Sequence, residues 1–248
     1  MGAYFVRRKE NNEIYFLVFK YYVMLILKYE LVHMFFIEGG RNKIGSYSKP
    51  KKGLLNYLLQ GAKKYKIKKD IIFVPVNISY DYVPESRVVV EESKSGKRKH
   101  IFKSVVNYLT NKNLGNCYVN FGHPVRVLNQ PRKLKPEDNT VDILGDSLMR
   151  KIKSLVIVSP IALLCYTLLN KNKMNYSEFR KNFLENLEKL KKLKNNISYI
   201  NLNKINDYID FAEEKGIINR NKHAKTIDIN NKQMQMVEYY SNNISHLF

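Results

Sequence analysis

A glycine pair that directly follows an apolar run, within residues 35–55, constrains the fold of this chain more than any other feature. The segment reads FFIEGGRNKIGSYSKPKKGLL, so that a Glu, two glycines and an Arg are followed by a basic turn and a second apolar run. Glycines at the end of a strand let the backbone approach a ligand closely, and the exposed N–H groups of such a turn bind anions. An arginine beside them offers a planar fork that suits a phosphate. The segment predicts a buried strand ending in an anion-binding turn, although an ordinary turn with a solvated Glu–Arg pair explains the same residues.

Strand-like and helical patterns alternate over the first half of the chain. The predicted elements, in order, are a strand at 4–6, a helix at 14–29, a strand at 31–37, a helix at 53–64, and strands at 71–80 and 117–121. Pro75 has no backbone donor, so the strand at 71–80 belongs at a sheet edge or contains a bulge. Alternating strands and helices predict an α/β fold with a mostly parallel central sheet flanked by helices.

The pattern changes near residue 140. Helices are predicted at 143–157, 161–169, 176–193 and 205–214, and Gly216 suits the end of the last one. A stretch rich in Pro, Lys and Asn at 129–139 separates these helices from the preceding strands. We therefore expect an α/β core over residues 1–135 and a smaller, mainly helical region over 136–248.

The composition of the chain indicates which classes of partner it could bind and which cellular compartment suits it. The 248 residues include 43 Lys and Arg against 22 Asp and Glu, and this net charge of +21 favours polyanions such as nucleic acid, anionic lipid surfaces and acidic carriers. Cys117 and Cys165 have no CxxC spacing, so we expect two buried thiols in a reducing compartment and no metal site. No signal peptide is visible, and the apolar runs at 14–27 and 156–169 are shorter than the roughly 20 residues that span a bilayer.

Three short stretches are more informative together than each is alone. They are GAYFVRR at 2–8, the segment at 35–55 described above, and FVPVNISYD at 73–81. In this order and at these spacings they resemble the second, third and fourth sequence blocks of the membrane-associated glycerol-3-phosphate 1-acyltransferases. That family belongs with the lysophosphatidate and dihydroxyacetone-phosphate acyltransferases. The resemblance continues in CYVNFGHPV at 117–125 and MVEYYSNNISHLF at 236–248, so it covers nearly the whole chain.

The resemblance implies transfer of an acyl chain from a thioester donor to the 1-hydroxyl of glycerol 3-phosphate. In the family, a His deprotonates that hydroxyl, an Asp orients the His, and arginines of the second and third blocks hold the substrate phosphate. The residues carried over by position are Arg7, Arg8 and Arg41 for the phosphate, Glu38, Gly39 and Gly40 for the shape of the site, and Pro75 for the fourth block.

The chain departs from the family at the catalytic His-Asp block. That block lies upstream of the second block, and only Met1 precedes Gly2, so we expect no catalytic pair here and no acyl transfer by this chain alone. His223 and Asp228 have the family's spacing, but they lie in a polar stretch near the C-terminus. His33 and Glu38 have a similar spacing, but an odd offset along a strand turns two side chains to opposite faces.

Several readings remain open. A truncated glycerol-3-phosphate acyltransferase would use acyl-CoA or acyl carrier protein as donor, need no bound cofactor, and lie peripherally on the cytoplasmic face of the cell membrane. Its acceptor could instead be dihydroxyacetone phosphate or a lysophospholipid. The second reading is a nucleic-acid-binding protein with a winged-helix-like unit at 176–228, although the scattered basic residues predict no specific nucleic acid. The third is a non-catalytic scaffold on an anionic membrane surface.

Overall fold

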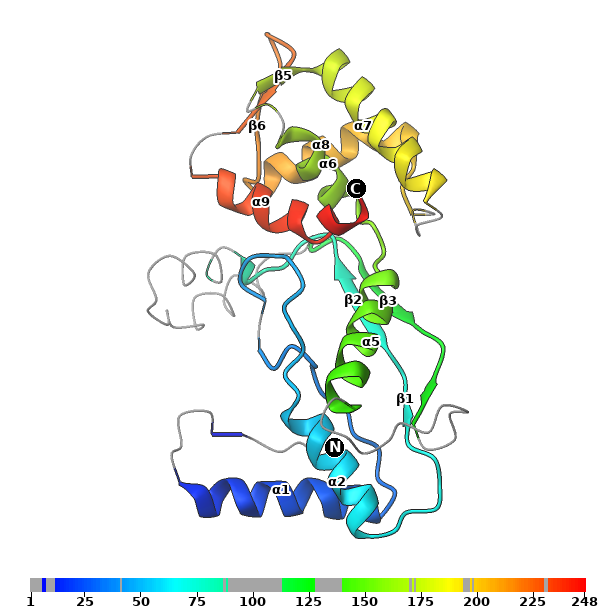
Figure 1. Ribbon diagram of the computed structural model, residues 1–248. Helices are drawn as coiled ribbons and strands as arrows, with labels where there is room; N and C mark the ends of the chain where they lie inside the picture. Colours follow the sequence, from blue (N-terminus) through cyan, green and yellow to red (C-terminus); the bar gives the residue numbers. More distant parts are fainter. Residues whose placement is uncertain are drawn as a thin grey trace. The chain divides into compact units, whose positions relative to one another are not determined.

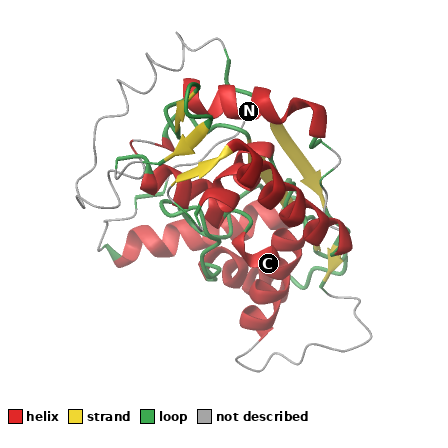
Figure 2. Cartoon of the chain, turned by 90° about the horizontal axis from the view of Figure 1, so that it is seen from above, coloured by secondary structure: helices red, strands yellow, loops and turns green. Residues whose placement is uncertain are grey.

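The computed structural model describes residues 6–7, 12–40, 42–86, 88, 113–127, 140–169, 171, 173–193, 197, 199–229 and 232–248 (Figure 1). Its α-helices are α1 (Glu13–Lys28), α2 (Gly53–Lys64), α5 (Thr140–Ser154), α6 (Pro160–Leu168), α7 (Tyr176–Lys192), α8 (Ile205–Glu214) and α9 (Met234–Asn242). Its strands are β1 (Ile72–Phe73), β2 (Val76–Tyr80), β3 (Cys117–Phe121), β4 (Val125–Arg126), β5 (Lys173–Asn175), β6 (Asn219–Asn221) and β7 (Thr226–Asp228). The short 3-10 helices are η1 (Leu202–Lys204) and η2 (Ser245–Leu247), and helices predominate over strands in the described chain (Figure 2).

The chain divides into two compact units. Unit 1 comprises Met1–Gly39, Lys49–Phe73 and Pro124–Met149, and unit 2 comprises Gly40–Ser48, Val74–His123 and Arg150–Phe248. Each unit contains segments from both of the regions predicted at 1–135 and 136–248, and that division of the sequence stays a prediction.

In unit 1, helices α1 and α2 pack against each other. Helix α1 begins after Asn12, whose side-chain oxygen accepts hydrogen bonds from the N–H groups of Ile14 and Tyr15 at 2.9 and 3.3 Å. Buried Met24 of α1 lies against Gly61 of α2, where an added β-carbon would be 3.1 Å from Met24 Cγ. A glycine at this position therefore allows the two helices to approach closely. The predicted helices at 14–29 and 53–64 are confirmed.

In unit 2, helix α6 lies at the centre of the apolar core. Its sequence PIALLCYTL is buried at eight of its nine positions, and it contacts α7, α8 and α9. The helix begins after Ser159, whose hydroxyl oxygen accepts a hydrogen bond from Ala162 N–H at 3.2 Å. Pro160 occupies the first helical position, where a missing backbone donor costs nothing. A helix that is apolar on all sides needs such a central place.

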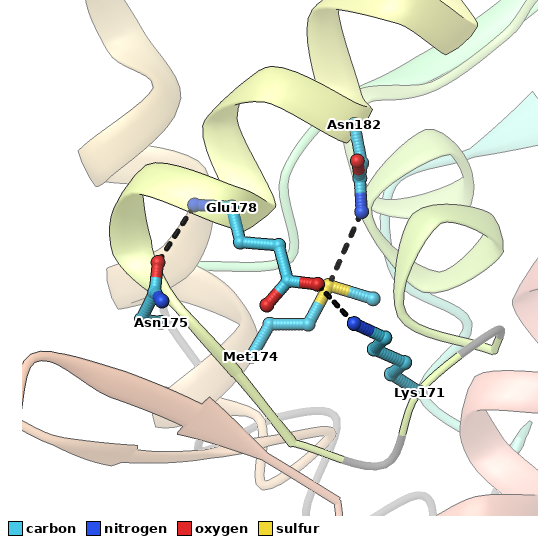
Figure 3. A network of polar contacts seen from close by, with 5 residues as sticks. All are labelled: Lys171, Met174, Asn175, Glu178 and Asn182. Atoms are coloured by element: carbon cyan, nitrogen blue, oxygen red, sulfur yellow. Dashed lines mark hydrogen bonds and ion pairs between the residues drawn. The ribbon is translucent and has the colours of Figure 1, made fainter.

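The start of α7 is fixed by side chains on both sides of it (Figure 3). Asn175 Oδ1 accepts a hydrogen bond from Glu178 N–H at 2.8 Å, and Lys171 forms an ion pair with the Glu178 carboxylate. One turn further on, Asn182 Nδ2 donates to Met174 Sδ at 3.7 Å. These contacts join strand β5 to α7, and they explain why the helix begins at Tyr176, as the sequence predicts.

The strand pairings among the described residues are all antiparallel. Strand β1 pairs with β4, β2 pairs with β3 from Val76 opposite Phe121 to Tyr80 opposite Cys117, and β7 lies between β5 and β6. Pro75 interrupts the strand predicted at 71–80 and separates β1 from β2, as its missing donor requires. The mostly parallel central sheet stays a prediction.

Part of unit 2 has a winged-helix-like order of elements. From α6 to β7 the chain runs helix, strand, helix, helix, strand, strand, and the first strand, β5, pairs with the last, β7. The second helix of the central pair is α8, whose sequence INDYIDFAEE is acidic. Because nucleic acids are polyanions, a helix with this charge repels the backbone that a winged-helix protein must approach.

Two predictions about local structure are wrong. The strand predicted at 31–37 is absent, and the side chains of Val32, Met34 and Phe36 are exposed. None of the strands in the described part of the chain pairs with this segment, and an unpaired strand is rarely stable. Cys117 was predicted to be buried but is exposed. Side chains alternate between the two faces of β3, so Cys117 points outward and the next residue, Tyr118, is buried. Cys165 is buried in α6, as predicted.

Candidate phosphate-binding site

The glycine turn predicted from the sequence is present in unit 1. Gly39 N–H donates to the carbonyl of Phe36 at 2.8 Å, which closes a tight turn. Gly39 has a φ of +68°, a conformation that favours glycine, and an added β-carbon would lie 2.7 Å from Lys51 Cγ. Lys51 N–H donates to the carbonyl of Ile37 at 2.7 Å, so the basic segment at 49–52 runs directly beside the turn. The anion-binding role of the turn stays a prediction.

Lys51 is a candidate that the sequence prediction did not include. The signal was the KPKK sequence at 49–52, but only the structure shows that the Lys51 side chain lies against Gly39. Helix α2 begins two residues later, and within the described chain its first turn contains no acidic residue and receives no side-chain cap. The N–H groups at a helix start carry a partial positive charge, so this end of α2 adds to the positive charge beside the turn.

The predicted arginines are only partly described. Arg7 lies in unit 1, where its backbone N–H donates to the hydroxyl of Tyr15 in α1 at 2.9 Å. This bond ties Arg7 to α1. Arg8 and Arg41 lie outside the described residues, so their predicted roles are carried by the sequence alone.

In unit 2, the loop after the glycine pair lies against the fourth-block strand. Pro75 is buried just before β2, and its carbonyl accepts a hydrogen bond from Gly122 N–H at 2.8 Å. Two residues further on, Asn77 Nδ2 donates to the hydroxyl of Tyr47 at 2.6 Å and to the carbonyl of Ile152 at 3.1 Å. Residues of the third and fourth blocks are therefore in direct contact.

The predicted site residues belong to different units. Arg7, Glu38 and Gly39 belong to unit 1, whereas Gly40 and Pro75 belong to unit 2. In chemical terms, unit 1 offers a glycine turn, a lysine and a helix start, all of which suit an anion. Unit 2 offers the loop that continues from Gly40.

Both histidine pairs with family-like spacing lie within the described residues. His223 is exposed in the turn between β6 and β7, while Asp228 lies in β7 and accepts a hydrogen bond from Asn219 Nδ2 at 3.4 Å. Burial lowers the pKa of His33 below its usual value of 6.5. No group of three or more His, Cys, Asp or Glu that could hold a metal ion occurs in the described part of the chain.

These features define a glycine turn bordered by a lysine and a helix start in a chain with the sequence blocks of an acyltransferase, and comparison with known proteins gives the family. A family model for the glycerol-3-phosphate acyltransferase C-terminal region matches residues 99–248, more than half of the chain. The glycerol-3-phosphate acyltransferase of Haemophilus ducreyi is 29% identical over 273 aligned residues, which cover 100% of this chain and 33% of that protein. The protein of the same name from Pseudoalteromonas atlantica is 30% identical over 278 residues, again with 100% and 33% covered.

The chain belongs to the glycerol-3-phosphate acyltransferase family, and the resemblance seen in the sequence is confirmed. It spans about one third of the length of the curated relatives that it matches. Among the helices that the structure describes, none combines the length and the apolarity needed to cross a membrane.

Proposed function

We propose that this chain binds the phosphate of glycerol 3-phosphate in an enzyme that transfers an acyl chain from a thioester to the 1-hydroxyl of that substrate. The observation that carries the proposal is the Gly39 turn, which lies against Lys51 in a segment with the family's third-block sequence. The names of the relatives support the reaction, and family membership supports the same acceptor for this chain.

Phosphate recognition would rest on several positive groups. Lys51 and the start of α2 are placed beside the turn, and the resemblance adds Arg7, Arg8 and Arg41. An arginine binds a phosphate through two parallel hydrogen bonds, whereas a lysine acts as a point charge. Groups of this kind would select the phosphate and leave the 1-hydroxyl to face the donor.

The proton acceptor for that hydroxyl would not be one of the phosphate-binding residues. The family's His-Asp block is the expected source, and its His would take the proton as the hydroxyl oxygen attacks the thioester carbonyl. The thiol of acyl-CoA or of acyl carrier protein would then leave. Both donors are acidic, and the net charge of +21 favours them and an anionic membrane surface alike. We propose peripheral attachment to the cytoplasmic face of the membrane.

The nucleic-acid alternative is weaker than the acyltransferase reading, although the winged-helix-like order of elements favours it. Helix α8, which would have to approach the nucleic acid, contains Asp207, Asp210, Glu213 and Glu214. Arg220 of β6 forms ion pairs with Asp210 and Glu213, so this cation is engaged within the unit. The arrangement supports a structural role for these elements.

Calorimetric titration of the purified chain with glycerol 3-phosphate at low ionic strength tests the proposal. We expect the chain to bind glycerol 3-phosphate but not glycerol. The affinity for glycerol 3-phosphate should fall by up to about tenfold in Arg41→Ala and in Lys51→Ala, because each variant loses a charged contact to the phosphate. Arg180→Ala is the matched control, since Arg180 is exposed on α7. Equal affinities for glycerol and glycerol 3-phosphate, or unchanged binding in both site variants, would rule the proposal out.

A further inference from the structure

The loop at 42–47 directly follows Arg41, and one side chain gives it a compact shape. Asn42 Oδ1 accepts hydrogen bonds from Ile44 N–H at 3.1 Å and from Gly45 N–H at 2.8 Å, while Asn42 Nδ2 donates to the carbonyl of Ser46 at 2.8 Å. A side-chain amide that bonds to the backbone on both sides in this way stabilises a tight turn.

The C-terminal helix α9 holds this loop by a hydrogen bond and a close backbone contact. Asn242 Nδ2 donates to the carbonyl of Ile44 at 2.7 Å, across 198 positions of sequence. Gly45 has a φ of +83°, and an added β-carbon would lie only 1.9 Å from the carbonyl oxygen of Tyr239. Only a glycine allows the loop to lie this close to α9.

A second contact comes from η2, at the end of the chain. The ring of His246 lies edge-on to the ring of Tyr47, with 5.2 Å between the ring centroids and 88° between the planes. His246 Nε2 also lies 3.3 Å from the carbonyl oxygen of Lys153, and Lys153 Nζ lies 5.9 Å from the centroid of the Tyr47 ring. The last turns of the chain therefore contact the loop at both Gly45 and Tyr47.

Helix α9 is itself fixed in the core of unit 2. Val237 of α9 is fully buried and Tyr240 is nearly so, and Ile244, just after the helix, is fully buried as well. The hydroxyl of Tyr240 accepts a hydrogen bond from Val83 N–H at 3.0 Å and lies 3.2 Å from Ser86 Oγ. A helix with these anchors is a rigid support for anything bound to its exposed side.

We propose that α9 positions the third-block loop for phosphate binding, and that Asn242 is the residue that carries this effect. The inference rests on the proposed function, since it concerns the same phosphate. Asn242 does not touch the substrate. It fixes the carbonyl of Ile44, and through it the compact loop at 42–47. The C-terminal residues of the chain are thus part of the substrate-binding machinery, although they lie about 200 positions from it in sequence.

Amide hydrogen exchange and calorimetry on the Asn242→Ala variant test the inference. The variant keeps the helix but loses the bond to Ile44, so we expect the Gly45 amide to exchange about fivefold faster and the affinity for glycerol 3-phosphate to fall by a similar factor. Asn182→Ala is the matched control, because it also removes one side-chain amide bond in unit 2, the bond to Met174 Sδ (Figure 3). We expect the control to change neither quantity.

The outcomes separate the inference from the proposed function. Unchanged Gly45 exchange in Asn242→Ala would overturn the inference, as would faster exchange with an affinity within twofold of the wild-type value. A wild-type chain that bound no glycerol 3-phosphate would remove the proposed function. The exchange comparison needs no ligand and would then still decide whether α9 holds the loop.

Discussion

Asn77, the buried second residue of β2, donates a 2.6 Å hydrogen bond to the hydroxyl of Tyr47, thirty positions earlier in the chain. The bond joins a residue of the fourth sequence block to the loop of the third block. The same amide nitrogen donates to the carbonyl of Ile152 at the end of α5, so three segments meet at one side chain. Segments from the third and fourth sequence blocks are therefore joined directly by a hydrogen bond in unit 2.

Removing the Tyr47 hydroxyl should weaken unit 2. In Tyr47→Phe the ring still packs against His246, but a buried N–H of Asn77 loses its acceptor, which we expect to cost about 1–2 kcal/mol of unfolding free energy. Urea unfolding of the two proteins measures the difference. Tyr199→Phe is the control, because its ring keeps the contact with Tyr118 and the residue is exposed. Equal losses in both variants would show that the Asn77 bond contributes nothing specific.

Gly45→Ala should destabilise the chain more strongly. The new methyl group meets the carbonyl of Tyr239 and the residue has a positive φ, so we expect a loss of about 3 kcal/mol or more. Gly53→Ala is the matched substitution in α2, where an added β-carbon has nothing within 4 Å, and it should be neutral or slightly stabilising. Thermal unfolding of both variants checks the contrast. A Gly45→Ala protein as stable as Gly53→Ala would mean that the loop does not lie against α9.

Helix periodicity and turn residues predict most of the helices and several of the strands. The predicted bounds of α2, β3 and α8 agree with the observed ones, because each has a clear apolar face or an adjacent stop such as Gly216. The contact between Asn242 and Ile44 could not be predicted, because two polar residues 198 positions apart leave no local pattern. Lys51 was missed for the same reason, since its place beside Gly39 depends on how the chain returns after the loop.

Acid should destabilise the folded chain through His246. Desolvation against its neighbours lowers the pKa of this imidazole, the nearby charge of Lys153 lowers it further, and the bond to the Lys153 carbonyl opposes both effects. A pKa lowered below 6.5 means that the unfolded chain binds the proton more readily. The contribution of neutral His246 to the free energy of unfolding is therefore fully present above pH 6.5 and is lost as the pH falls through the folded-state pKa.

The difference in unfolding free energy between pH 7.5 and pH 5.5 measures this effect. We expect it to be smaller in His246→Phe than in the wild-type chain. His33, whose pKa burial also lowers, is present in both proteins and cancels from the comparison. The same pH dependence in the two proteins would contradict the assignment.

Binding to duplex DNA should report net charge alone. A chain with a net charge of +21 will bind polyanions at low salt, and the affinity should fall steeply as salt is added. The acidic sequence of α8 gives no means of reading bases, so different sequences should compete equally. A salt titration with two unrelated duplexes checks this, and a clear sequence preference would revive the nucleic-acid reading.

Mapping the bound ligand on the chain tests the central claim most directly. Amide proton–nitrogen spectra recorded during a titration with glycerol 3-phosphate, with glycerol as the control, should show the largest shifts at Gly39, Gly40, Lys51 and Gly53. Glycerol should leave these amides unchanged. Shifts that appear equally with glycerol, or that lie elsewhere in the chain while the turn stays unchanged, would contradict the assignment of this turn to the substrate phosphate.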